Sequence, residues 1–150
     1  MTQKITERRL AMAAVSSVAG GIVAWTIGQV DYLPIDQRDF ILVSIQGAFA
    51  AGLLVAPIFG GTGFAAILRS LTGFALATFL GAMLATLMVP LQDYLDHLNV
   101  FGALMTWLYS AFLGPLFVLI NLLGNGWVLL VWLLCALASH TLATAFQWGD

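Results

Sequence analysis

The chain has 150 residues, of which 61% are hydrophobic and only 8% are charged. Soluble domains carry about 25% charged residues, so this composition excludes a soluble globular fold. The formal net charge is -2, and the 5 Lys and Arg residues form no patch of the kind that nucleic-acid binding requires. We therefore expect one all-α integral membrane domain over 1–150 that binds no nucleic acid.

The first apolar run covers 10–30 and follows a basic start that contains Arg8 and Arg9. Its Ala-x-Ala spacing lies at its beginning, where no signal-peptidase site belongs, so we expect a retained first span. The second run covers 40–59, after the polar turn DYLPIDQRD. The GGTG segment that follows lacks the Gly-Lys-Ser/Thr ending of a phosphate loop, so it predicts a flexible turn.

The third apolar run, 70–90, has the most regular pattern of small residues. They recur every fourth position, at Gly73, Ala77, Gly81 and Ala85. Residues four apart share one face of a helix, so one side of this helix is reduced almost to backbone. A run of about twenty apolar residues spans roughly 30 Å, the thickness of a bilayer core. We expect a transmembrane helix that ends at Pro90 and is surrounded by other helices.

Two more apolar runs, 100–123 and 127–146, complete a predicted compact bundle of five transmembrane helices. The Gly114-Pro115 pair predicts a kink in the fourth, because proline removes a backbone hydrogen bond. Small residues recur every fourth position in four of the five runs, and close helix packing in lipid uses such residues. The predicted helix-packing glycines are Gly20, Gly28, Gly52, Gly73, Gly81 and Gly114. The pattern favours packing within one chain, with contacts between subunits as the alternative.

Charged residues divide between the two sides of this predicted bundle. One side receives the basic residues Lys4, Arg8, Arg9 and Arg69, and the other receives Arg38 with the acidic residues Asp31, Asp36, Asp39, Asp93, Asp96 and Asp150. An excess of Lys and Arg marks the cytoplasmic side, so we expect the N-terminus inside and, after five spans, the C-terminus outside. The small size of the chain and the general character of its sequence indicate a bacterial inner membrane.

Two ionisable residues in the apolar runs are candidate functional groups. Arg69 lies about one helical turn below the apolar core, and its long stem can carry the guanidinium to the headgroups. We expect it to anchor the helix in membrane lipids, with binding of an anion or lipid phosphate as the alternative. His140 lies roughly 20 Å along the last helix from Trp127, which predicts a position in the outer third of the membrane.

The imidazole of His140 could ligate haem or a pigment, bind a quinone or relay protons. A b-type haem takes two axial histidines, and the second of the 2 histidines, His97, lies in a predicted loop. We therefore expect no cofactor, and a histidine that is hydrogen-bonded inside the bundle.

Several polar residues fall in the outer half of the predicted bundle together with His140. They are Gln46, Thr86, Thr106, Tyr109, Ser110 and Thr144. Buried polar groups need partners, so these residues either satisfy one another or line a shallow outward-facing pocket. The sequence leaves both arrangements open.

Catalytic patterns are missing from the sequence. It contains no HExxH, no paired carboxylates within a span and no Ser-His-Asp set at a suitable depth, so we expect neither an enzyme nor a metal site. The sequence favours a non-catalytic subunit or scaffold that packs against other membrane subunits or copies of itself. The alternative is a small transporter or channel with a polar pocket near His140.

Overall fold

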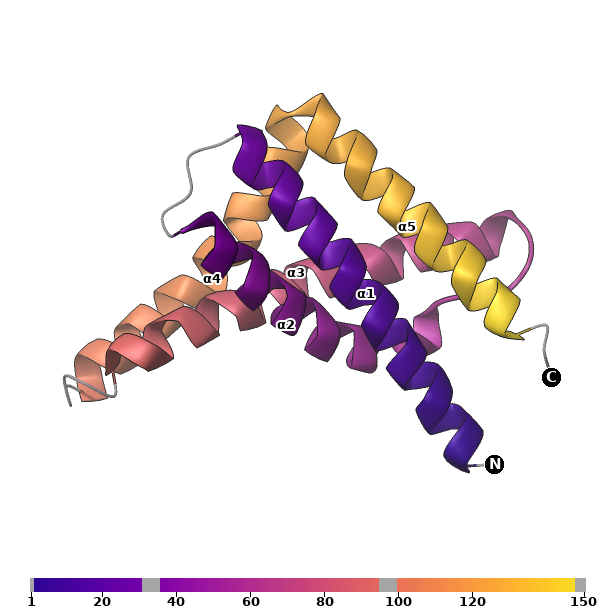
Figure 1. Ribbon diagram of the computed structural model, residues 1–150, viewed down its shortest axis with the longest axis horizontal. Coiled ribbons are helices and arrows are strands. Elements are labelled where there is room, and N and C mark those ends of the chain that lie inside the picture. Colours follow the sequence, from indigo (N-terminus) through magenta and orange to yellow (C-terminus); the bar gives the residue numbers. More distant parts are fainter. Residues whose placement is uncertain (1, 31–35, 95–99, 148–150) are drawn as a thin grey trace.

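The computed structural model is helical throughout its secondary structure in the residues that it describes, which are 2–30, 36–94 and 100–147. The helices are α1 (Thr2–Val30), α2 (Gln37–Val55), the short 3-10 helix η1 (Ala56–Ile58), α3 (Phe64–Tyr94), α4 (Val100–Gly124) and α5 (Gly126–Gln147) (Figure 1). The five predicted helices are confirmed. Asp31, Asp96, His97 and Asp150 lie outside the described residues, as do the side chains at 2–5, 88–94, 100–104, 106–107, 110 and 146–147.

Polar side chains define where two of the helices begin. The Asp36 carboxylate accepts a hydrogen bond from the Arg38 backbone N–H at 2.8 Å, which caps the start of α2. The Asn125 side-chain oxygen accepts from the N–H groups of Trp127 and Val128 at 3.0 and 3.4 Å. Because the first N–H groups of a helix have no partner within the helix, these contacts stabilise the two starts.

Proline and glycine separate α2 from α3, whereas the proline near the end of α3 does not stop that helix. Helix α2 stops at Val55, and Pro57 lies in η1, where the missing N–H is tolerated. The chain then turns at Gly60 and Gly61, whose φ angles are 91° and 101°, a region that suits glycine. The sequence predicted that the helix would end at Pro90, but α3 continues through Pro90 to Tyr94. Membrane helices tolerate proline where neighbouring groups satisfy the freed backbone.

Four segments among the described residues are long and apolar enough to cross a membrane. They are Thr6–Val30, Gln37–Ile58, Phe64–Leu87 and Gly126–Ala145. Helix α4 contributes a shorter apolar segment, Ala111–Gly124, from its described part. The chain is therefore consistent with an integral, multi-pass membrane protein.

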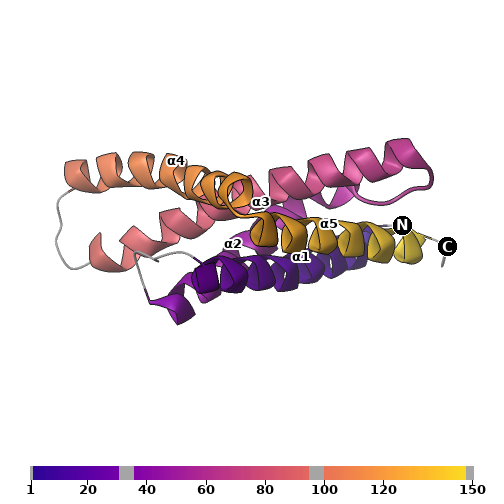
Figure 2. The same cartoon turned by 90° about the horizontal axis from the view of Figure 1, so that it is seen from above.

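Helix α1 packs against α2, α2 packs against α3, and α3 packs against α4. Helix α5 returns along α1 (Figure 1), and the hairpin formed by the end of α3 and the start of α4 projects away from both of them. Seen from above, α4 and the start of α3 lie on the side opposite α1 (Figure 2). The arrangement is therefore more open than the compact bundle expected from the sequence.

The small-residue stripes mesh with one another inside the chain. A Cβ added at Gly20 would lie 2.5 Å from the Ala48 Cβ, and one at Gly52 would lie 2.7 Å from the Ser16 Cβ, so α1 and α2 approach through glycine. A Cβ at Gly81 would lie 3.2 Å from the Ala48 Cα. The same test places Gly73 against Ile58 and Gly114 against the Ala82 carbonyl, whereas Gly28 is a half-buried residue near the end of α1.

The end of α5 lies beside the turn between α2 and α3. The Thr144 hydroxyl donates to the Gly61 carbonyl at 3.2 Å, and Arg8 near the start of α1 reaches Phe59 of the same turn. The first helix therefore starts, and the last helix ends, at one end of the molecule (Figure 1). Strict alternation of five spans would put them at opposite ends. The difference arises because α4 returns to the end of α1 and not to the turn (Figure 1).

Candidate functional site

His140 is hydrogen-bonded to a buried serine on α3. Its Nδ1 lies 2.9 Å from the Ser70 Oγ, with the donor and acceptor roles set by the imidazole tautomer. Ser70 is 0% exposed, and its Oγ also accepts the Gly60 backbone N–H at 3.2 Å. The pair therefore connects α5 to α3 and to the turn after η1.

Two arginine side chains donate hydrogen bonds to backbone carbonyls of this turn. The Arg69 guanidinium donates to the Gly60 oxygen at 2.8 Å, and the Arg8 guanidinium donates to the Phe59 oxygen at 3.4 Å. We call Arg8, Arg69, Ser70, His140 and Thr144 the turn cluster, because each contacts the turn or a residue that does. It joins α1, α3 and α5, three helices that are far apart in sequence.

The Ser70–His140 pair has the spacing but not the access that nucleophilic catalysis requires. A nucleophilic serine needs a base in hydrogen-bond reach and access to a substrate carbonyl. The distance to His140 fits the first requirement, but Ser70 is 0% exposed, so no substrate can reach its Oγ in this conformation. Among the side chains that the structure describes, no group of three or more His, Cys, Asp or Glu lies close enough together to hold a metal ion.

Of the polar residues that the sequence placed with His140, the described side chains of Thr86, Gln46 and Tyr109 do not lie beside it. Thr86 lies roughly 24 Å further along α3 than Ser70, and its hydroxyl donates within its own helix to Ala82 and Met83. Gln46 and Tyr109 are exposed on α2 and α4. Of Thr106 and Ser110 only the helical backbone is described. From the predicted site, the structure brings together His140, Thr144 and Arg69.

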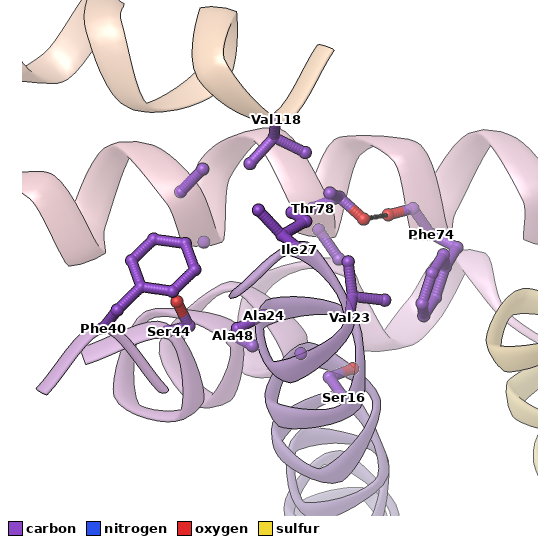
Figure 3. Close-up of a pocket in the computed structure, with 14 residues that line it drawn as sticks. Ser16, Val23, Ala24, Ile27, Phe40, Ser44, Ala48, Phe74, Thr78 and Val118 are labelled. Atoms are coloured by element: carbon purple, nitrogen blue, oxygen red, sulfur yellow. Dashed lines mark hydrogen bonds between the residues drawn. The ribbon is translucent and has the colours of Figure 1, made fainter. Parts of the chain in front are cut away.

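The described region has a cavity that the sequence did not predict. It has a volume of about 60 Å³ and lies between α1, α2, α3 and α4 (Figure 3). Its walls are mostly apolar or small, and its hydroxyl groups come from Ser16, Ser44 and Thr78. One water occupies roughly 10–15 Å³ in this measure, so the space suits a few waters or one very small molecule.

The Ser16 hydroxyl in this cavity is buried without a hydrogen-bond partner. Ser16 is 3% exposed, whereas the neighbouring Thr78 hydroxyl donates to the Phe74 carbonyl at 2.8 Å and accepts from the Trp132 indole at 2.9 Å. In the sequence, Ser16 begins the every-fourth-residue pattern of small residues in the first apolar run, with Gly20, Ala24 and Gly28. Nothing in that pattern distinguishes a hydroxyl that lacks a partner from one that has one.

No protein-family model, curated protein or solved structure matches this chain.

Proposed function

We propose that this protein is a non-catalytic membrane subunit that works by packing against other helices, in a homo-oligomer or with other membrane proteins. The observation that carries the proposal is the exposed apolar side of α4, which packs within this chain mainly against α3. Phe112 and Leu123 on α4 are 77% and 78% exposed, and Trp127 at the start of α5 is 60% exposed.

The surface available to a partner is built from large side chains. The small-residue stripes of α1, α2 and α3 are occupied by contacts within the chain. We define the α4–α5 surface by the exposed residues Phe112, Leu116, Ile120, Leu123, Trp127, Leu130 and Leu134. Without a hydrophobic drive in lipid, a partner would bind here through close packing of these side chains.

Orientation follows from the charges at the two ends. Arg8, Arg9 and Arg69 are near the end formed by the turn cluster, and Asp36 and Asp39 are at the start of α2, at the opposite end. We propose that the turn-cluster end faces the cytoplasm, as the excess of basic residues favours. In this arrangement four spans bring the end of α5 back to the cytoplasmic side. The five-span arrangement with an external C-terminus, and the bacterial inner membrane, remain predictions of the sequence.

Photo-crosslinking in native membranes tests the subunit proposal. Benzoylphenylalanine replaces Leu123 on the α4–α5 surface, and in a matched control it replaces Val18, which is 64% exposed on α1. We expect a discrete protein adduct from position 123 and none from position 18, with mass spectrometry identifying a second copy or another protein. Lipid adducts alone from position 123, in membranes where the protein is expressed at its native level, would contradict the proposal.

A small transporter is the second candidate, and the cavity at Ser16 is the observation that favours it. The cavity lining contains no charged residue, so the solute would be small and uncharged. Uptake of small uncharged solutes such as glycerol into proteoliposomes tests this function. Lower uptake in Ser16→Ala, with folding intact and with Ser17→Ala as the control, would support transport. Rates equal to those of empty liposomes would exclude these solutes and leave the subunit function preferred.

A further inference from the structure

Two arginines from distant parts of the chain meet at the turn between η1 and α3. Arg8 on α1 donates to the Phe59 carbonyl and Arg69 on α3 donates to the next carbonyl, that of Gly60. Successive carbonyls are only a few ångströms apart, so the two guanidinium nitrogens that make these contacts lie within roughly 11 Å of one another at one end of the molecule. Neighbouring like charges repel, and an anion between or beside them removes that repulsion.

No carboxylate of the described residues pairs with either guanidinium. The hydrogen bonds described for Arg8 and Arg69 are to the two backbone carbonyls. Glu7 precedes Arg8 on α1, but successive helix positions point about 100° apart. Asp36 and Asp39 lie at the start of α2, toward the other end of the molecule.

Each guanidinium retains donors for a ligand. Arginine carries five N–H donors in a planar fork, and the contacts described use one nitrogen of each residue. The fork matches two oxygens of a phosphate, and the charged hydrogen bonds that result are shorter and stronger than neutral ones. The carbonyl contacts hold both side chains at the turn, so less side-chain freedom is lost when an anion binds.

We propose that Arg8 and Arg69 together bind the phosphate group of an anionic lipid headgroup. Arg69 lies in the second turn of α3, and its side chain reaches back toward the start of the helix to Gly60, the direction in which long basic side chains reach the headgroups. The potentially membrane-crossing segment Phe64–Leu87 begins at the same turn, so the pair lies at the level of the headgroups. This site is independent of the proposed subunit function.

Native mass spectrometry of the full chain in a neutral detergent tests the site. The protein is titrated with phosphatidylglycerol, with zwitterionic phosphatidylcholine and with inorganic phosphate as a competitor. We expect one phosphatidylglycerol to bind at least about tenfold more tightly than phosphatidylcholine, and Arg8→Gln or Arg69→Gln each to weaken that binding about tenfold, the effect of one charged hydrogen bond. Competition by millimolar phosphate would assign the site to free phosphate in place of the lipid.

Variants at other arginines separate a specific site from general attraction of charge. Arg38→Gln, beside the cap of α2, and Arg9→Gln, one position beyond Arg8, remove the same charge and should leave binding unchanged. Arg69→Lys keeps the charge without the fork and should retain part of the affinity. Circular dichroism checks that each variant is folded. Equal binding of the two lipids, or equal losses in all four arginine-to-glutamine variants, would overturn the proposal.

Discussion

Nδ1 of His140 lies 2.9 Å from the Oγ of Ser70, and this contact joins α5 to α3 across 70 residues of sequence. Ser70 in turn accepts the Gly60 N–H, so one buried hydroxyl connects two helices and a turn. The histidine that is the strongest candidate for chemistry in the sequence therefore has a structural partner.

Replacing His140 measures the strength of this connection. His140→Ala leaves the Ser70 hydroxyl without its side-chain partner, and hydrogen bonds between membrane helices contribute about 0.6 kcal/mol, with a maximum near 1.7. We expect a small loss of thermal stability in detergent and at least partial rescue by His140→Gln, which can hydrogen-bond. Crosslinking from position 123 should persist in both variants. A folded His140→Gln protein that has lost solute uptake into proteoliposomes would favour a chemical role.

The double variant with Ser70→Ala isolates the pair. If the two side chains interact directly, the destabilisation of the double variant should be smaller than the sum of the single ones by about 0.5–1.5 kcal/mol. Additive losses within about 0.3 kcal/mol would show that the contact contributes nothing beyond its separate parts.

Two buried serines should respond in opposite ways to the same substitution. Ser70→Ala strands the Gly60 N–H and the His140 ring nitrogen, so we expect a loss of about 1–3 kcal/mol. Ser16→Ala removes a hydroxyl that has no partner, so we expect no loss or a small gain in stability. Melting of the two purified variants under identical conditions compares them. A larger loss at Ser16 would show that its hydroxyl is satisfied by bound water or solute.

Substitutions at glycine test the meshing of the stripes. A Cβ at Gly47 would collide with the Gly81 carbonyl oxygen, whereas one at Gly126 meets nothing within 4 Å. We expect Gly47→Ala to destabilise the protein by about 1–3 kcal/mol and Gly126→Ala to have little effect. Thermal melting in detergent measures both.

Larger residues on α3 extend this test. Gly81→Leu places a side chain against the Ala48 backbone and should be at least as damaging as Gly47→Ala, while Leu84→Phe on a half-buried position should be milder. Unchanged yield and melting in Gly81→Leu would show that α2 and α3 do not pack through this stripe.

Cysteine labelling distinguishes the two topologies. In a Cys135→Ser background, which removes the 1 native cysteine, single cysteines are placed at Thr2, Asp36 and Gln147. The four-span arrangement predicts that an impermeant thiol reagent added to spheroplasts labels position 36 and spares positions 2 and 147. The five-span arrangement predicts labelling at 147 as well. Labelling of position 2 but not 36 would reverse the proposed orientation.

The sequence by itself determined the five helices and, for α4 and α5, both ends to within about one residue. The predicted run 100–123 is α4, Val100–Gly124, and the run 127–146 is α5, Gly126–Gln147. These features are local, because the length of an apolar run and the polar or glycine residues beside it act within one segment. Other ends differ from the prediction: α1 begins at Thr2 and α3 at Phe64, ahead of the expected 10 and 70, and the stop signal at Pro90 was overridden inside α3.

Only the tertiary structure decided which polar groups meet. The sequence placed His140 in the outer third of the membrane and Arg69 on the opposite side, whereas the structure brings both to the turn after η1. The difference depends on the direction in which α4 and α5 return. The contacts of Ser70 with His140, and of Arg8 and Arg69 with one turn, follow from helix rotation and neighbour order. Apolar faces in a membrane carry little information about either, because lipid tails solvate one face of a helix as well as another.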